Sequence, residues 1–302
     1  MDELTSAGIE DSALRESFLE CKRLNALHGK TYYLATLLLP KSKRPFVHAL
    51  YGFARYADEI VDDLDSKLSP AEKRAELERW SFQMLQDLKH GRSDDHIGRA
   101  LVETVRRFDI PIAYFEAFLH SMAMDLDVTE YQSYENLLEY VYGSAAVIGL
   151  QMVSVLGTLE GEEERARIAA EKLGIAFQLA NFIRDVGEDL ERGRVYLPLS
   201  ELAQFNVDRA MLEKRVLTPE IVAALKFQIE RVRQLQREAN TGIPLLNPAA
   251  RPCIEAASEL YCGIVDEVEK IDYEVFSKRA KTSTFRRVRV ALPAWTRAVR
   301  AR

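Results

Sequence analysis

The spacing of acidic residues is the feature of this sequence that most directly suggests chemistry. The segments Asp58-Glu-Ile-Val-Asp62 and Asp185-Val-Gly-Glu-Asp189 each place two carboxylates four residues apart. Residues at this spacing share one face of an α-helix, so each pair would point the same way. Like charges at that spacing cost an isolated helix roughly 0.2–0.5 kcal/mol, so both arrays call for cations.

Hard oxygen ligands of this kind select Mg²⁺, with Mn²⁺ as the other possibility, over zinc. Mg²⁺ usually takes one or two carboxylates and completes its coordination with water and substrate phosphates. Asn181 extends the second array by one turn, and Gln178 lies close to the same stripe. The pattern therefore predicts a phosphate-bearing substrate held between two acidic helices. Asp63, Asp65 and Glu188 flank the arrays and are expected either to be solvated or to support the metal ligands indirectly, rather than to bind the metal themselves.

Helical periodicity dominates the rest of the chain and predicts the elements that position these residues. No alternating run is long enough to require a sheet, and no repeat or linker divides the chain, so one all-α domain over residues 1–302 is the simplest prediction, although length alone would allow two. The predicted helices span about 14–27, 45–64, 70–88, 97–107, 111–124, 134–156, 162–190, 207–212, 219–241 and 252–273.

One segment, from Val141 to Leu159, lacks charged residues and is nearly long enough to cross a membrane. It contains four polar side chains and three glycines, and Glu139 and Glu160 flank it. A buried core helix is therefore the preferred interpretation.

Composition narrows the function classes. The net charge of −6 argues against a nucleic-acid partner, which usually binds a basic stripe. The three cysteines have no zinc-like spacing and are expected to be reduced thiols in a cytoplasmic protein. The acidic N-terminal segment shows no signal-peptide pattern.

The C-terminal segment, residues 275–302, has the opposite character. It has no acidic residue and nine basic residues, with apolar side chains such as Phe285, Leu292 and Trp295 between them. It is either a basic surface tail or a contact with anionic lipid, to which each basic residue contributes about 1 kcal/mol. The second interpretation predicts peripheral association with the inner face of the membrane.

Several long motifs, in order, make the sequence resemble the squalene/phytoene synthase family, and its bacterial phytoene synthases in particular. The resemblance covers nearly the whole chain. The segments that carry it are 28–40, 51–63, Met124-Asp-Leu126, 140–149, 173–198 and 272–280.

The resemblance implies an isoprenoid-synthase-type helical bundle around a central cavity. It also implies a prenyltransferase that condenses two geranylgeranyl diphosphates head to head, through a cyclopropylcarbinyl diphosphate, to phytoene, as the first committed step of carotenoid biosynthesis. The implied metal ligands are Asp58, Asp62, Asn181, Asp185 and Asp189, and the four aspartates and Tyr140 are expected to be catalytic. The implied substrate-binding residues are Lys30, Arg55, Gln178, Asn181, Arg184, Arg194, Tyr196 and Arg279.

A carbocation formed in this chemistry needs a dry cavity and aromatic faces. The candidates are Tyr32, Tyr33, Tyr140, Tyr142 and Phe177. Each one alone fits an ordinary core aromatic equally well, and the resemblance favours the catalytic interpretation for Tyr140. Residues 125 and 127, both aspartates, match a family motif, but their role is open.

Other activities remain possible within the resemblance. Squalene or dehydrosqualene synthases share the first half-reaction but use farnesyl diphosphate, and squalene synthases also need NADPH, which is not expected here. Thr36 stands where relatives that make C30 products carry a bulky aromatic residue, which favours the longer geranylgeranyl substrate. A terpene cyclase and a catalytically silent scaffold are the further alternatives, and the two intact aspartate arrays disfavour both.

Overall fold

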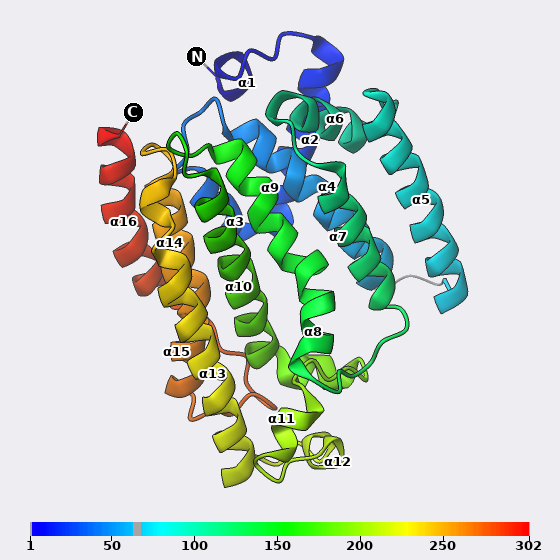
Figure 1. Ribbon diagram of the computed structural model, residues 1–302, viewed down its shortest axis with the longest axis vertical. Coiled ribbons are helices and arrows are strands. Elements are labelled where there is room, and N and C mark those ends of the chain that lie inside the picture. Colours follow the sequence, from blue (N-terminus) through cyan, green and yellow to red (C-terminus); the bar gives the residue numbers. More distant parts are fainter. Residues whose placement is uncertain (1, 63–67, 302) are drawn as a thin grey trace.

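The computed structural model describes residues 2–62 and 68–301 and shows the all-α bundle expected from the sequence (Figure 1). Within those residues, β-structure is limited to two isolated bridges. The helices are α1 (Glu3–Ser6), α2 (Ser12–His28), α3 (Lys30–Thr36), α4 (Arg44–Asp62), α5 (Pro70–His90), α6 (His96–Phe108), α7 (Ile112–Met124), α8 (Tyr134–Val141), the π-helix η1 (Tyr142–Ala146), α9 (Val147–Leu156), α10 (Glu163–Glu191), α11 (Leu199–Ala203), α12 (Arg209–Glu213), α13 (Pro219–Asn240), the 3₁₀-helix η2 (Ile243–Leu245), α14 (Arg251–Cys262), α15 (Ile264–Lys270) and α16 (Thr284–Arg300).

Local sequence signals set most of the helix ends. Ser69 and Glu72 form a capping box at the start of α5, and Pro70 occupies its first turn. The side chains of Asp95 and Thr218 cap α6 and α13 in the same way. The long helix predicted over 252–273 is instead two helices, α14 and α15, which meet at Gly263.

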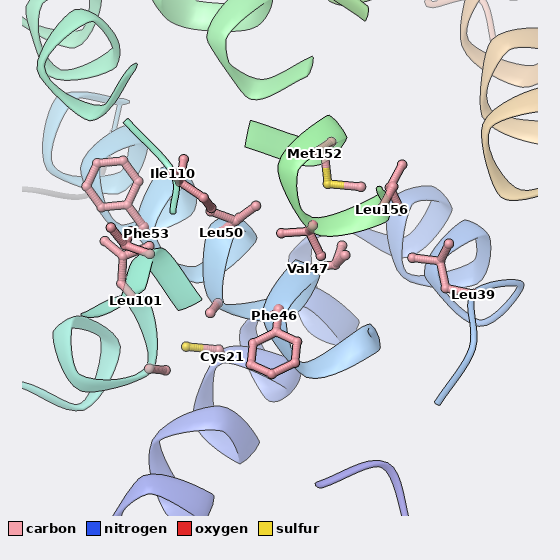
Figure 2. Packing of buried hydrophobic residues seen from close by; sticks show 14 of the residues in the cluster. Cys21, Leu39, Phe46, Val47, Leu50, Phe53, Leu101, Ile110, Met152 and Leu156 are labelled. Carbon is pink, nitrogen blue, oxygen red and sulfur yellow. The ribbon is translucent and has the colours of Figure 1, made fainter. Parts of the chain in front are cut away.

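The hydrophobic core has two clusters. The first, partly shown in Figure 2, joins α2, α4 and α6 to α9 through residues such as Phe46, Leu50 and Met152. The second surrounds α10 and includes Ile183 and Leu225. Ile254 on α14 packs against both clusters, so the two cores meet along this helix. That the chain is a single unit stays a prediction.

Helix α10 runs through the middle of the bundle, packed against α9, η1, α13 and α14 (Figure 1). Its close approach to η1 requires a residue without a side chain. A Cβ on Gly174 would lie 2.5 Å from the carbonyl oxygen of Ala145, which no larger residue could accept without moving the backbone. This contact fixes the central helix against the wall that carries Tyr140 and Ser144.

The apolar segment over 134–156 is a core helix. Helices α8, η1 and α9 together are long and apolar enough to cross a membrane, yet 61% of the most apolar window is buried inside the bundle. It packs against α7 on one side and α10 on the other. The buried-core interpretation of residues 141–159 therefore fits the structure.

The basic C-terminal segment is a docked helix, which the sequence pattern did not indicate. Helix α16 lies along the outside of α14, at the edge of the bundle (Figure 1). Its inner face consists of Val290, Ala294 and Ala298, all buried. Cys21, Cys253 and Cys262 are buried, and no disulfide joins them.

Candidate active site

Both aspartate arrays line one polar cavity of about 360 Å³ between α4 and α10. Helix α4 contributes the first pair near its C-terminal end, and α10 contributes the second pair in its last two turns. Residues from α7, α8, the loop between them and the segment after α10 complete the lining of the cavity. Its lining includes Tyr51, Arg55, Asp58, Asp62, Asp125, Tyr140, Ser144, Gln178, Asn181, Arg184, Asp185, Asp189, Arg192, Arg194 and Tyr196.

Arginines hold the first aspartate pair. Arg55 donates to Asp58 Oδ2 at 2.8 Å, one turn away on the same helix. Arg192 and Arg194 reach across from the end of α10 to Asp62, at 2.8 Å and 3.1 Å. Burial, followed by the charge of Asp62, raises the pKa of Asp58 above its usual value.

In the second pair, arginines bind Asp185. Arg184 Nε donates to Asp185 Oδ1 at 2.7 Å, and Arg279 Nε reaches the same oxygen at 3.0 Å from the segment before α16. Burial and the charge of Asp185 raise the pKa of Asp189 to about 7. Glu188 lies outside the pair and contacts Arg279 at 3.3 Å.

The expectation for Asp63 and Asp65 falls outside the described residues.

The donor chemistry of this cavity fits a hard divalent cation. Among residues 2–62 and 68–301, no three or more acidic, histidine or cysteine side chains gather into a ready-made metal site. The carboxylates instead form two pairs, and Mg²⁺ commonly uses only one or two carboxylates beside substrate phosphate. Burial, followed by the charge of the neighbouring aspartate, raises the pKa values of Asp58 and Asp189, and a bound cation would stabilise their charged forms.

A buried hydrogen-bond network supports one wall of the cavity. The hydroxyls of Tyr140 and Tyr196 donate to the two carboxylate oxygens of Asp125, at 2.7 Å and 2.9 Å. Arg194 donates to the Asp125 carbonyl oxygen at 2.9 Å while it also binds Asp62. Burial raises the pKa of Asp125 to about 6, and it raises the pKa of Tyr140 well above the usual value. The network links tyrosines to the residues that hold the first aspartate pair.

An apolar cavity of about 240 Å³ continues from the polar one. Ser144, Gln178 and Asn181 line both cavities and mark the junction. Beyond them the walls come from α3, α9, α10 and α14 and are almost entirely apolar. Besides the junction residues, the lining includes Tyr32, Thr36, Ile148, Met152, Val153, Leu156, Leu173, Phe177, Ile243, Cys253, Ile254, Ala257 and Tyr261.

The structure brings most of the expected site residues to these cavities. Gln178 and Asn181 stand at the junction, and Thr36 is buried in the wall of the apolar cavity, where its hydroxyl donates to the Tyr32 carbonyl at 2.9 Å. Phe177 lines the same cavity and stacks on Tyr261 with ring centroids 4.9 Å apart.

Three expected residues lie elsewhere. The side chain of Lys30 is exposed at the start of α3 and lines neither cavity. Tyr33 stacks on His48, with ring centroids 5.7 Å apart, and Tyr142 is 41% exposed, so neither lines a cavity as the cation hypothesis required. The direction in which an aromatic ring points depends on how its helix is oriented in the bundle, and the residue type alone does not reveal that orientation.

Three cavity residues were not singled out from the sequence or were left without a role. Arg192 binds Asp62, and its signal was the basic run Arg192-Gly-Arg194 after the second array. No motif around Tyr261 indicated that it lines the cavity, because it lies on α14, far along the chain from both aspartate arrays. Asp125 had a motif but no role until its two tyrosine partners were located.

Comparison with known proteins identifies the family. The family model for squalene/phytoene synthase matches residues 26–286. The 15-cis-phytoene synthase of Synechococcus elongatus is 37% identical over 287 residues, covering 92% of each chain. That of a Synechocystis species is 36% identical over 296 residues, covering 95% of this chain and 87% of the relative. A solved dehydrosqualene synthase with bound ligand superposes with a TM-score of 0.85 at 28% identity, covering 98% of both chains. The chain therefore belongs to the squalene/phytoene synthase family.

Proposed function

We propose that this protein is a phytoene synthase, a prenyltransferase that joins two geranylgeranyl diphosphates head to head and releases diphosphate. The observation that carries the proposal is the junction of a carboxylate- and arginine-lined cavity with an apolar one. The first matches a diphosphate with its cations, and the second matches long hydrocarbon chains. Relatives named as phytoene synthases, similar over nearly the whole chain, support it.

The arginines of the polar cavity would bind the diphosphate and stabilise it as it leaves. Arg55, Arg184 and Arg194 line the cavity, and their planar forks match phosphate oxygens. When bound through Asp58, Asp62, Asn181, Asp185 and Asp189, Mg²⁺ or Mn²⁺ would supply further electrostatic stabilisation of the leaving group. Substrate phosphate would then replace part of the present carboxylate–arginine pairing.

The apolar cavity would protect the allylic cation formed when diphosphate leaves. The double bond of the second substrate attacks that cation and, after proton loss, gives the cyclopropylcarbinyl diphosphate. Loss of the second diphosphate, rearrangement and a further proton loss give phytoene. Phe177 and Tyr261 line this cavity with their rings stacked on each other, and a ring face that contacts the cation would stabilise it by about 0.5–2 kcal/mol. Tyr140 stands on the polar side, fixed by Asp125.

The test is incubation of the purified protein with Mg²⁺ and either farnesyl or geranylgeranyl diphosphate, with and without NADPH, and mass analysis of the products. We expect a C40 hydrocarbon from geranylgeranyl diphosphate without NADPH. A C30 product as the main outcome would contradict the proposal and indicate a squalene or dehydrosqualene synthase.

Variants separate an enzyme from a silent scaffold. Asp58→Asn and Asp185→Asn keep size but remove one charge from each pair, and we expect each to lower turnover by at least ~100-fold. Glu191→Gln is the matched control, because its carboxylate lies on α10 but is 65% exposed and pairs with Arg215. Equal activity of all four proteins would refute the assigned roles.

A C40 hydrocarbon is almost insoluble in water. We therefore also propose that the protein associates peripherally with the inner face of the membrane, where this product would be released. The proposed location is otherwise the cytoplasm, and no nucleic-acid partner is proposed.

A further inference from the structure

Helix α16 carries an unpartnered apolar stripe on the face that points away from the bundle. Its members are spaced three and four residues apart, so they share one side of the helix. All of them are large and about half or more exposed: Phe285 76%, Val288 56%, Leu292 60%, Trp295 54% and Val299 49%. We name this set the α16 stripe.

The opposite face holds α16 rigidly on the body of the protein. Val290, Ala294 and Ala298 are buried against α14. Arg286 donates to the Gly263 carbonyl at 3.1 Å and pairs with Asp266 at 2.8 Å. The helix is therefore a fixed part of the surface, and its stripe is presented in one direction.

The charge on the helix selects the partner. Helix α16 contains five arginines and no acidic residue. Arg286 is engaged with α15, and Arg297 pairs with Glu255 at 3.1 Å. Arg289 and Arg300 are exposed, and neither forms an ion pair with any residue in the described ranges. By helical spacing they lie along one edge of the stripe.

We propose that the α16 stripe is a membrane-binding surface that inserts into the interface of a bilayer containing anionic lipids. A helix with aromatic and aliphatic residues on one side and arginines beside them lies in the plane of such an interface. Trp295 is of the type enriched at that depth. A second copy of this helix would bring the same unneutralised arginines against one another, which disfavours self-association through the stripe.

The location of the surface adds a functional reason. Helix α14 separates α16 from the apolar cavity, since Cys253, Ile254 and Ala257 of α14 line that cavity. The proposed membrane face is therefore one helix away from the space where an apolar product would form. The vesicle-binding test needs no catalytic turnover, so it stands or falls separately from the proposed activity.

The experiment is co-sedimentation of the full chain with vesicles of phosphatidylglycerol and phosphatidylethanolamine, or of phosphatidylcholine alone. We expect binding to the anionic vesicles. The triple variant Val288→Ser, Leu292→Ser, Trp295→Ser should lower the partition coefficient by ~100-fold or more, because three apolar side chains no longer enter the interface. Arg289→Gln with Arg300→Gln should lower binding to anionic vesicles by about 30-fold, since each arginine contributes about 1 kcal/mol.

The matched control is the triple variant Phe82→Ser, Ile168→Ser, Val216→Ser. These side chains are 65%, 49% and 60% exposed but lie on or beside other elements, so their loss should leave vesicle binding unchanged. Circular dichroism checks that every variant is folded. Unchanged binding of the α16 variant would overturn the proposal. The proposal would also be overturned if the wild type failed to bind vesicles and formed a dimer in sedimentation velocity that the α16 variant abolished.

Discussion

Replacing Thr36 by phenylalanine should shift the preferred substrate from geranylgeranyl to farnesyl diphosphate. Thr36 is 2% exposed and lies in the wall of the apolar cavity, opposite residues of α9 and α10. A phenylalanine side chain there adds about four non-hydrogen atoms, close to the five carbons of one isoprene unit. The added ring and the last isoprene unit of the longer chain would compete for the same space.

The size of the effect follows from the hydrocarbon that is displaced. Each buried methylene is worth about 0.8 kcal/mol, so one isoprene unit contributes at most about 4 kcal/mol to binding. Partial displacement would cost a fraction of this. The ratio of kcat/KM for geranylgeranyl over farnesyl diphosphate should therefore fall by between about 10-fold and 1000-fold. Overpacking should also destabilise the fold by about 1–3 kcal/mol.

The assay compares kcat/KM for the two substrates in the wild type, Thr36→Phe and Thr36→Val, with thermal unfolding as the check on folding. Thr36→Val keeps the volume and loses only the hydroxyl that donates to the Tyr32 carbonyl at 2.9 Å, so its substrate ratio should match the wild type. An unchanged ratio in a folded Thr36→Phe protein would show that the end of the substrate chain does not reach this wall.

Three further predictions concern the polar cavity. Asp125→Asn weakens the hydrogen bonds that Tyr140 and Tyr196 donate to this side chain, and it should lower kcat by ~10- to 100-fold with a small change in melting temperature. An unchanged kcat would show that this network has no role in catalysis. Because the folded-state pKa of Asp189 is raised to about 7, the metal-free protein should lose stability as pH rises from about 4 through 7; calorimetry should show that Mg²⁺ stabilises it more at pH 8 than at pH 5, and Asp189→Asn should flatten this difference. Arg279→Met removes a guanidinium 3.0 Å from Asp185 and should raise KM for the diphosphate substrate several-fold; a change in kcat alone would argue against a binding role.

The parts of the fold that the sequence predicted well are those with strong local signals. The capping box at Ser69 and the prolines at 70 and 219 mark helix starts that the structure confirms. Helix α16 was missed although its apolar residues have helical spacing, because Pro293 and the many arginines made the segment resemble a surface tail. The contact with α14 that docks the helix is tertiary, and no local pattern encodes it.

The candidate site divides in the same way. Four-residue spacing brought out both aspartate arrays, because the carboxylates of each pair share one helix. The partners of Asp125 are 15 and 71 residues away, so its role depends on tertiary contacts. Lys30 matched a motif yet its side chain is exposed, because α3 turns it away from both cavities.

The π-helical turn η1 has a geometric consequence for the whole wall of the site. A π-turn holds one residue more than the hydrogen bonding of an α-helix would, so it rotates the helix before it by about 100° relative to the helix after it. Tyr140 before the turn faces the polar cavity, and Ile148 and Met152 after it face the apolar one. Across this offset Tyr140, Ile148 and Met152 lie along one face of the helix, so that face borders the polar cavity first and the apolar cavity further along. Deletion of a single residue between 142 and 146 would restore a regular helix and turn Tyr140 away from the polar cavity that it lines.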